Sequence, residues 1–404
     1  MPPVFHSILD TKNGAHNSPK LWAVGGAKGR VVLMSESSNL LALIQQTLDE
    51  FCEKQRESFA AISPDLAPVI DNSKALMQGG KRFRALFAYY AWAGTLPVAA
   101  HSQTPQQLAL SSEAMVSITS ALEMFHAAAL VHDDILDNSA TRRGEPSVHK
   151  KFESLHTREG YAGTAERFGL GGAILSGDLL LSWSSEMFGH ALENAPTREI
   201  GHACRDEFAK MRTEVMAGQY LDVLEENAAL TRPVSEAVWR ANRVMLYKTA
   251  KYSLEAPMLI GAAFAGADEE LLHAFSTFAV PLGLAFQLRD DVLGVFGDPA
   301  VTGKPVGDDL REGKRTVLVG LTRETLSTSV AGVFDEMLSL RELDAEQIKF
   351  LQQTIVDSGA LAKTERMIED LADQSLEALG ALEIAEPAKQ ALHALALKVI
   401  KRDN

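Results

Sequence analysis

The scarcity of cysteine in this sequence excludes several classes of protein. Cys52 and Cys204 are the only two cysteines in 404 residues, too few for a disulfide framework or a zinc cluster. No apolar run reaches the ~18 residues expected of a membrane span. The N-terminus also lacks the basic and then apolar segments of a secretory signal. We therefore expect a cytoplasmic protein without a transmembrane segment.

Positive charge is also in short supply. The chain has 39 lysines and arginines against 53 aspartates and glutamates, which gives a net charge of −14. Nucleic acid is therefore not an expected partner. A protein this acidic can still bind an anionic ligand, but only through a local basic site or a metal ion.

Strand-like alternation of apolar and polar residues is nearly absent, whereas helical periodicity is present almost throughout. From Ser38 onward, apolar residues recur at i, i+3, i+4 and i+7 in segment after segment. Hydrophobic residues make up 46% of the chain, so a well-buried core is expected. We predict an all-α fold, a single large helical bundle of roughly a dozen helices.

The first 37 residues differ from the rest of the chain. Gly, Asn, Pro and Ser are scattered through residues 1–37 without any sustained period. We expect a disordered or loosely attached leader here, followed by one domain over residues 38–404. Met34 opens a serine-rich stretch before the first periodic segment. The hypothesis that Met34 is the natural start would be tested by N-terminal sequencing of protein made from the native gene.

A first acidic motif occurs in the segment LVHDDILDNSATRRG. On a helix Asp133 and Asp137 share one face, and Asp134 lies about a third of a turn away. The preceding residues FHAAALV are small and apolar, so this face is expected inside the bundle, where unpartnered carboxylates are costly. A hard divalent cation would resolve the conflict, and Mg²⁺ prefers one or two carboxylates plus substrate phosphates. The alternative is an acidic, solvated helix end.

A second acidic motif, in FQLRDDVLGVFGD, also ends a long apolar segment. It contains Asp290 and Asp291, with Gln287 one turn earlier. Two such helix ends suggest two walls that face each other across a cavity and hold a diphosphate through several Mg²⁺ ions. Two independent solvated helix ends are the alternative.

Cations occur where an anionic substrate would need them. GGKRFR places Lys81 and Arg84 at a helix start, a geometry that suits phosphate oxygens but is also an ordinary surface feature. Arg142 and Arg143 follow the first acidic motif. His126 precedes that motif on the same apolar segment, where a hydrogen-bonded core histidine is the simpler interpretation.

Five motifs in order carry a family resemblance. GGKRFR, EMFHAAALVHDDILDNSATRRG, GQYLD, YKTA and FQLRDDVLG…GK…DLREGK resemble the trans-isoprenyl diphosphate synthases, the polyprenyl synthetases that make farnesyl, geranylgeranyl and longer diphosphates. The resemblance extends from about residue 70 to the C-terminus. It implies an all-α bundle around a central cavity, usually a homodimer, with isopentenyl diphosphate and an allylic diphosphate as substrates.

The resemblance also implies roles for individual residues. Three Mg²⁺ ions would be ligated by Asp133, Asp137 and Asp290, supported by Asp134, Gln219, Asp222 and Asp291. Contacts to the allylic diphosphate and its ionising carbon would come from Arg142, Lys248, Thr249, Gln287, Lys304 and Lys314. Isopentenyl diphosphate would be bound by Lys81, Arg84, His126 and Arg143.

Two positions depart from the family pattern. The second acidic motif usually reads DDxxD, but Gly294 stands at its third acidic position. This puts a supporting water contact in doubt rather than the principal ligand. Ala85 follows GGKRFR where the family often has proline, and we expect only a local effect on the helix start.

The expected mechanism follows from charge. Cations stabilise the leaving diphosphate, so the allylic C–O bond can break in a Mg²⁺-assisted ionisation. A dry cavity protects the allylic cation from water. The alkene of isopentenyl diphosphate then attacks in a head-to-tail 1'-4 condensation. A proton leaves to the departing diphosphate, as the family implies, so no general base is required.

The length of the product is also predicted. The growing chain should run along the first acidic helix toward its N-terminus, past Ala129 and Ala128, where short-chain relatives place an aromatic floor. Phe125 is the first large side chain, one turn deeper. A turn of about 5.4 Å is close to one isoprene unit, which favours geranylgeranyl diphosphate (C20). The alternative is that Phe125 faces another helix and the floor lies elsewhere.

Several other functions were weighed against this one. A farnesyl or longer-chain polyprenyl diphosphate synthase would differ only in the depth of the cavity. A class I terpene cyclase would need an NDxxSxxxE-like second motif and no second diphosphate site. A non-catalytic regulatory subunit of a prenyl synthase would be expected to have lost one acidic motif, whereas this sequence has both.

Overall fold

The computed structural model describes residues 28–99, 105–298, 306–340 and 343–401. Within these ranges the chain is almost entirely helical, which confirms the all-α prediction. The elements in chain order are α1 Lys28–Ala60, η2 Pro64–Leu66, α2 Ala67–Leu76, α3 Phe83–Thr95, α4 Pro105–Leu136, β1 Thr141–Arg142, β2 Glu145–Pro146, α5 Val148–Glu159, α6 Ala165–Leu192, α7 Arg198–Ala228, η3 Ala229–Thr231, η4 Val234–Glu236, α8 Ala237–Val244, η5 Met245–Glu255, α9 Ala256–Ala265, α10 Glu269–Phe296, α12 Asp308–Arg311, α13 Val317–Thr325, α14 Thr328–Leu338, α15 Ala345–Asp357, α16 Ala360–Ala381 and α17 Glu386–Ile400.

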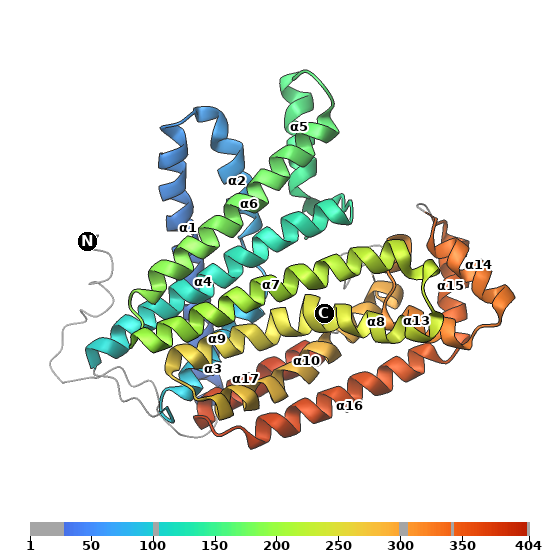
Figure 1. The fold of residues 1–404 in the computed structure, drawn as a ribbon. Helices are drawn as coiled ribbons and strands as arrows, with labels where there is room; N and C mark the ends of the chain where they lie inside the picture. The colour runs from blue at the N-terminus through green and yellow to red at the C-terminus, as the bar shows by residue number, and fades with distance from the viewer. Residues whose placement is uncertain (1–27, 100–104, 299–305, 341–342, 402–404) are drawn as a thin grey trace.

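The long helices lie alongside one another and form a bundle (Figure 1). Helix α4 packs on α6, α3 packs on α9, and α10 packs on α16 and on η5. The helices α8, α13, α14 and α15 gather at one end, and the strands β1 and β2 form a small antiparallel hairpin after α4. Helix α1 begins at Lys28, inside the segment predicted as a leader, and residues 1–27 lie outside the described part of the chain.

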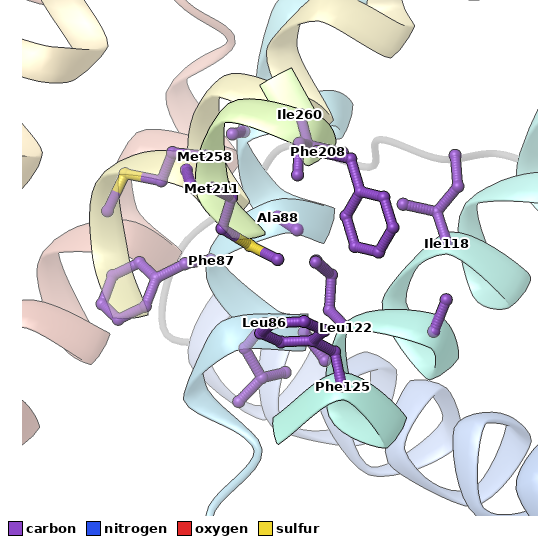
Figure 2. Packing of buried hydrophobic residues seen from close by; sticks show 14 of the residues in the cluster. Leu86, Phe87, Ala88, Ile118, Leu122, Phe125, Phe208, Met211, Met258 and Ile260 are labelled. Carbon is purple, nitrogen blue, oxygen red and sulfur yellow. The ribbon is translucent and has the colours of Figure 1, made fainter. Parts of the chain in front are cut away.

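The bundle interior is packed with aliphatic and aromatic side chains from α3, α4, α7 and α9. Figure 2 shows Leu86, Leu122, Phe125 and Phe208 converging from three of these helices. Phe125 is only 1% exposed. Burial of this kind contributes roughly 1.5–3 kcal/mol for each large apolar side chain, and it holds the end of α4 in a fixed position.

Among the described residues, two helices are long and apolar enough to cross a membrane, by length and composition alone. They are α10 and the segment Leu110–Leu136 of α4, and the most apolar windows of α10 and α4 are 44% and 72% buried inside the bundle. Core helices of a bundle pass the same test, because they are apolar on most of their surface.

Candidate active site

The carboxylates of the first acidic motif divide between two sets of partners. Asp133 accepts a hydrogen bond from Gln219 Nε2 on α7 at 3.1 Å and lies 3.1 Å from Lys248 Nζ on η5. Lys248 also pairs with Asp222 of α7. The Asp137 side chain, which directly follows the end of α4, is only 6% exposed. Asp133 is therefore held by polar groups of α7 and η5, and Asp137 lies one turn beyond it.

Asp134 points to a different neighbour. Its carboxylate is 1% exposed, and Oδ1 accepts two hydrogen bonds from Arg142, from Nε at 2.8 Å and from one terminal nitrogen. The same guanidinium lies 3.6 Å from Asp133 Oδ2. Arg142 thus ties the hairpin that follows α4 back onto the acidic helix end, while Asp133 remains available to the interior.

A π-helix lies opposite the first acidic motif and carries the lysine that contacts it. Element η5 runs from Met245 to Glu255 and carries Lys248 and Thr249 toward α7 and α10. π-helical segments are rare and occur frequently at functional sites. Pro257 lies two residues beyond η5 and has no amide hydrogen to donate to the preceding turn. Gly218 on α7 lets the two backbones meet, because a Cβ atom there would lie 2.9 Å from Lys248 Cα.

The second acidic motif is tied to η5 by a chain of hydrogen bonds. Thr249 Oγ1 donates to Gln287 Oε1 at 2.7 Å, and Gln287 Nε2 donates to Asp291 Oδ1 at 2.8 Å. Asp291 is 3% exposed, whereas Asp290 is partly exposed. Burial, and then the charge of Asp309, raise the pKa of Asp291 well above its usual value.

Lys314 lies between the first acidic motif and α12. Its Nζ atom lies 3.8 Å from Oδ2 of Asp137, just after the end of α4, 3.7 Å from Asp309 Oδ1 on α12 and 2.6 Å from Glu312 Oε2. Burial lowers the pKa of Lys314, but the three carboxylates outweigh it and hold the pKa well above the usual value. Helix α12 and Lys314, which follow the second acidic motif along the chain, therefore face the end of α4.

Carboxylates outnumber cations around Asp133 and Asp137, and the pKa values of these two residues reflect the excess of negative charge. Burial raises the pKa of Asp137, the neighbouring Asp133 charge raises it further, and the result is about 6. Burial would also raise the pKa of Asp133, but Lys248, Lys314 and Arg142 reverse that effect and lower it. A site of this kind is short of positive charge and suits divalent cations.

A second cluster of cations lies two turns earlier along α4. Arg84 Nη2 donates to Ser253 Oγ at 2.6 Å, and the Arg84 guanidinium lies 4.6 Å from the centre of the Tyr252 ring. The Tyr252 hydroxyl is 3.3 Å from His126 Nδ1. Burial, followed by the charges of Arg84, Arg143 and Arg142, lowers the pKa of His126 well below its usual value.

The loop GGKRFR divides its side chains between the surface and the core. Lys81 is exposed, whereas Arg82 is buried, adopts a positive φ of 46° and donates to Gln45 Oε1 and to the Met77 carbonyl. Arg143 Nη1 donates to the Gln78 carbonyl at 3.1 Å, which places Arg143 beside this loop. Arg142 and Arg143 also line a cavity of about 330 Å³.

The proposed floor residue Phe125 belongs to an aromatic cluster. Its ring lies 6.2 Å from Phe208 on α7 and 5.8 Å from Tyr252 on η5, and Phe188 of α6 stacks on Phe208 at 4.1 Å. Ala129 follows Phe125 by four residues on the same face of α4 and is partly exposed. Ala128 is fully buried.

Some polar residues of the site were not predicted from the sequence. They are Asp309 and Glu312 beside Lys314, Glu226 with a pKa raised to about 7 by burial and by Asp222, and Tyr252 with Ser253 beside Arg84. Glu226 had a detectable signal, because it lies four residues after Asp222 on one helix face. Lys304 was predicted as a site residue and lies outside the described residues.

Comparisons with known proteins agree with this geometry. The polyprenyl synthetase family model matches residues 69–355. The crystal structure of geranylgeranyl pyrophosphate synthase from Corynebacterium glutamicum, complexed with isoprenyl diphosphate and magnesium, has a TM-score of 0.81 and 34% identity, covering 90% of this chain and 98% of that one. A short chain isoprenyl diphosphate synthase of Methanocaldococcus jannaschii is 30% identical over 83% of this chain and 87% of its own. A geranylfarnesyl diphosphate synthase of Aeropyrum pernix is 32% identical over 76% of this chain and 85% of its own.

The all-α bundle, with acidic motifs at the ends of two long helices and a separate cluster of cations, is the fold of the isoprenyl diphosphate synthases. The chain belongs to the polyprenyl synthetase family. It is a prenyltransferase, which confirms the family resemblance inferred from the five motifs.

The residues of the site fit magnesium, which is present in the Corynebacterium neighbour. The available donors are carboxylate oxygens, the hard ligands that Mg²⁺ prefers. Asp291 Oδ2 is buried and has no hydrogen-bond partner among the described residues. Within the same ranges, no group of three His, Cys, Asp or Glu side chains is arranged to hold a metal ion without other ligands. This suits an ion whose remaining ligands are water and substrate phosphates.

Proposed function

We propose that this prenyltransferase binds an allylic diphosphate between its two acidic motifs, with three Mg²⁺ ions, and isopentenyl diphosphate at the Arg84 cluster. The product that the site fits best is geranylgeranyl diphosphate. The allylic site is supported above all by one observation, the contact of Lys314 with Asp137 and Asp309. This contact brings the first acidic motif and α12, the helix that follows the second motif, around one buried cation.

At the proposed allylic site, we expect the lysine to exchange its carboxylate contacts for the diphosphate when the substrate binds. Lys248 pairs with Asp133 and Asp222, and a diphosphate would offer it a stronger anion. Bound Mg²⁺ would supply positive charge that stabilises the leaving diphosphate. The Thr249 hydroxyl and the Gln287 amide form a fixed polar pair beside this position, and the apolar interior behind them keeps water from the allylic cation.

At the other end, Arg84 and Arg143 provide charge for a second diphosphate. His126 lies seven residues before Asp133 on α4, which corresponds to about 10 Å along the helix axis. That separation leaves room for a five-carbon unit between the two diphosphate groups. A terpene cyclase has no use for a second anion site, so the Arg84 cluster favours a synthase. A regulatory subunit would not need both acidic motifs.

The product length rests on the stripe formed by Asp133, Ala129 and Phe125, spaced four residues apart on one face of α4. We expect the small Ala129 to leave room for the growing chain below the metal site, and we expect Phe125, which packs against Phe208 and Tyr252, to end that room. Eight residues of helix, roughly 12 Å along the axis, separate Asp133 from Phe125. This depth supports C20, whereas an aromatic residue at position 129 would support C15.

The test is an incubation of purified protein with labelled isopentenyl diphosphate and each allylic primer in turn, with Mg²⁺ or EDTA. The dephosphorylated products are then sized by chromatography. Mg²⁺-dependent elongation that stops at C20 supports the proposal. Elongation that stops at another length overturns the C20 assignment and leaves the enzyme class intact.

Phe125→Ala tests the floor directly. The shortened side chain should let the product grow beyond C20, and the lost packing should cost about 3–5 kcal/mol of folding stability. Phe334→Ala is the matched control, because Phe334 is equally buried but lies on α14, in the second apolar cluster, which does not include Phe125. A longer product from Phe334→Ala, or an unchanged product from folded Phe125→Ala, would refute the assignment.

The family resemblance also predicts a cytoplasmic homodimer. Helix α6 supports the dimer, because it presents Phe168, Ile174 and Leu175 as exposed apolar side chains, and Leu175 is 62% exposed. Light scattering of the purified protein, and of Leu175→Glu, tests this. A monomeric wild-type enzyme with full activity would refute the dimer.

A further inference from the structure

A buried carboxylate lies within the cation cluster that is proposed to bind isopentenyl diphosphate. Glu123 belongs to α4, three residues before His126, and is 9% exposed. Burial raises the pKa of Glu123, whereas the positive charges of Arg84 and Arg82 act to lower it. A negative charge here would repel a diphosphate, and burying it is costly unless it is paired. Glu123 therefore calls for a role other than contact with the substrate.

One contact of Glu123 is with the start of α3. Its Oε1 atom accepts a hydrogen bond from the Ala85 amide at 3.3 Å. Ala85 is the third residue of α3, where an amide has no partner within the helix. Arg82, at the N-cap position, makes no capping hydrogen bond through its side chain. Glu123 thus caps α3 from a different helix, and its charge suits the positive end of the α3 dipole.

The second contact of Glu123 is with Arg82. Glu123 Oε2 lies 3.8 Å from Arg82 Nη1, and Arg82 is 7% exposed. Two further partners of this guanidinium, Gln45 Oε1 and the Met77 carbonyl, are uncharged. Arg82 also has a φ of 46°, which is uncommon for a residue other than glycine. Such a conformation persists only where the surroundings hold it, and Glu123 supplies the opposite charge.

We propose that Glu123 is a positioning residue for isopentenyl diphosphate. It holds Arg82 and Ala85, and Arg84 lies between these two residues in the chain, on the first turn of α3. Fixing this turn directs the Arg84 guanidinium toward Ser253 on η5. Glu123 acts through Arg84 and does not itself contact the substrate. This inference rests on the proposed role of Arg84 in the isopentenyl diphosphate site.

Glu123→Gln tests the ion pair, because it keeps the size of the side chain and an acceptor for the Ala85 amide. It leaves Arg82 buried without its carboxylate partner, so the first turn of α3 should shift and carry Arg84 with it. The KM for isopentenyl diphosphate should rise by about tenfold or more, as expected when a substrate-positioning group is displaced. The KM for the allylic substrate should stay as in the wild type. Glu123→Ala, which also removes the acceptor, should raise the KM for isopentenyl diphosphate further.

Glu225→Gln is the matched control. Glu225 on α7 is 5% exposed and accepts a hydrogen bond at 2.9 Å from Nε of Arg240, which is 6% exposed. Glu123→Gln and Glu225→Gln each break a buried pair of glutamate and arginine, so both should lower the temperature of thermal unfolding. Glu225→Gln should leave the KM for isopentenyl diphosphate unchanged.

Arg84→Gln separates this inference from the proposed function. A wild-type KM for isopentenyl diphosphate in Arg84→Gln would mean that the proposed site itself is wrong. If Arg84→Gln raises this KM and folded Glu123→Gln does not, the site stands and the role of Glu123 is overturned. A lower KM in Glu123→Gln, or an equal rise in Glu225→Gln, also overturns that role. A rise confined to isopentenyl diphosphate in the Arg84 and Glu123 variants supports both.

Discussion

Replacing Gly218 with alanine would test how closely α7 and η5 must approach to hold Lys248. The added Cβ atom would lie 2.7 Å from the Tyr247 carbonyl carbon and 2.9 Å from Lys248 Cα. Carbon atoms in packed interiors sit about 3.5–4.0 Å apart. The two helix backbones must therefore separate by roughly 1 Å at this point, and Lys248 must move with η5.

Gly218→Ala should affect folding stability and catalytic rate by different amounts. Overpacking costs typically about 1–3 kcal/mol, partly offset by the gain of about 1 kcal/mol that alanine brings over glycine in a helix. The net loss of stability is therefore modest. A displacement near 1 Å of a substrate-positioning group can cost about 100-fold in rate. Gly218→Ala should thus remain folded and lose much more activity than stability.

The assay compares thermal unfolding and kcat/KM for the allylic substrate in Gly218→Ala and in Gly189→Ala. Gly189 lies inside α6, and a Cβ atom there would meet nothing within 4 Å. Gly189→Ala should be as active as the wild type and slightly more stable. If both variants behave alike in both measurements, the close approach of α7 to η5 does not position Lys248.

Three further predictions concern the polar groups of the site. Thr249→Val removes the donor to Gln287 Oε1 and should lower kcat/KM by roughly tenfold or more, whereas Thr249→Ser keeps the hydroxyl and should be nearly normal in the same steady-state assay. The Mg²⁺ concentration needed for half-maximal rate should rise as the pH falls through about 6, because protons then compete with the metal for Asp137. A Mg²⁺ concentration for half-maximal rate that does not change with pH would contradict this. The raised pKa of Asp137 means that its contribution to folding stability is present below its unfolded-state pKa and is lost as the pH rises through about 6. Metal-free Asp137→Asn should therefore be more stable than the wild type above about pH 7, by up to about 3 kcal/mol in denaturant unfolding, and equal stability would refute the burial of this charge.

The parts of the site that could be predicted from the sequence are those that lie along single helices. The spacing of Asp133 and Asp137 predicts one shared face, and the structure places both near the cations Lys248 and Lys314. The apolar residues before them predict burial, which the structure has at Ala128 and Phe125. These inferences needed only helical periodicity.

The parts that could not be predicted depend on contacts between distant segments. Nothing in the local pattern around Asp309 indicates that its carboxylate fills the space above Gly294 on another helix. Arg82 was overlooked because burial beside Gln45 requires the path of α1, which the loop sequence does not contain. The π-helical form of η5 also lacks a local signal, since its residues have ordinary helical propensities.

The π-helix has a consequence for how the two substrates influence each other. In such a helix the hydrogen-bonded turn closes over five residues, so Lys248 lies nearly above Ser253. Lys248 contacts the acidic walls, and Ser253 holds Arg84 at the other cluster. Residues of both proposed substrate sites are therefore carried by one short helical segment. A substitution that shifts η5 to suit a different allylic primer would also alter the grip on isopentenyl diphosphate, so the two Michaelis constants should change together.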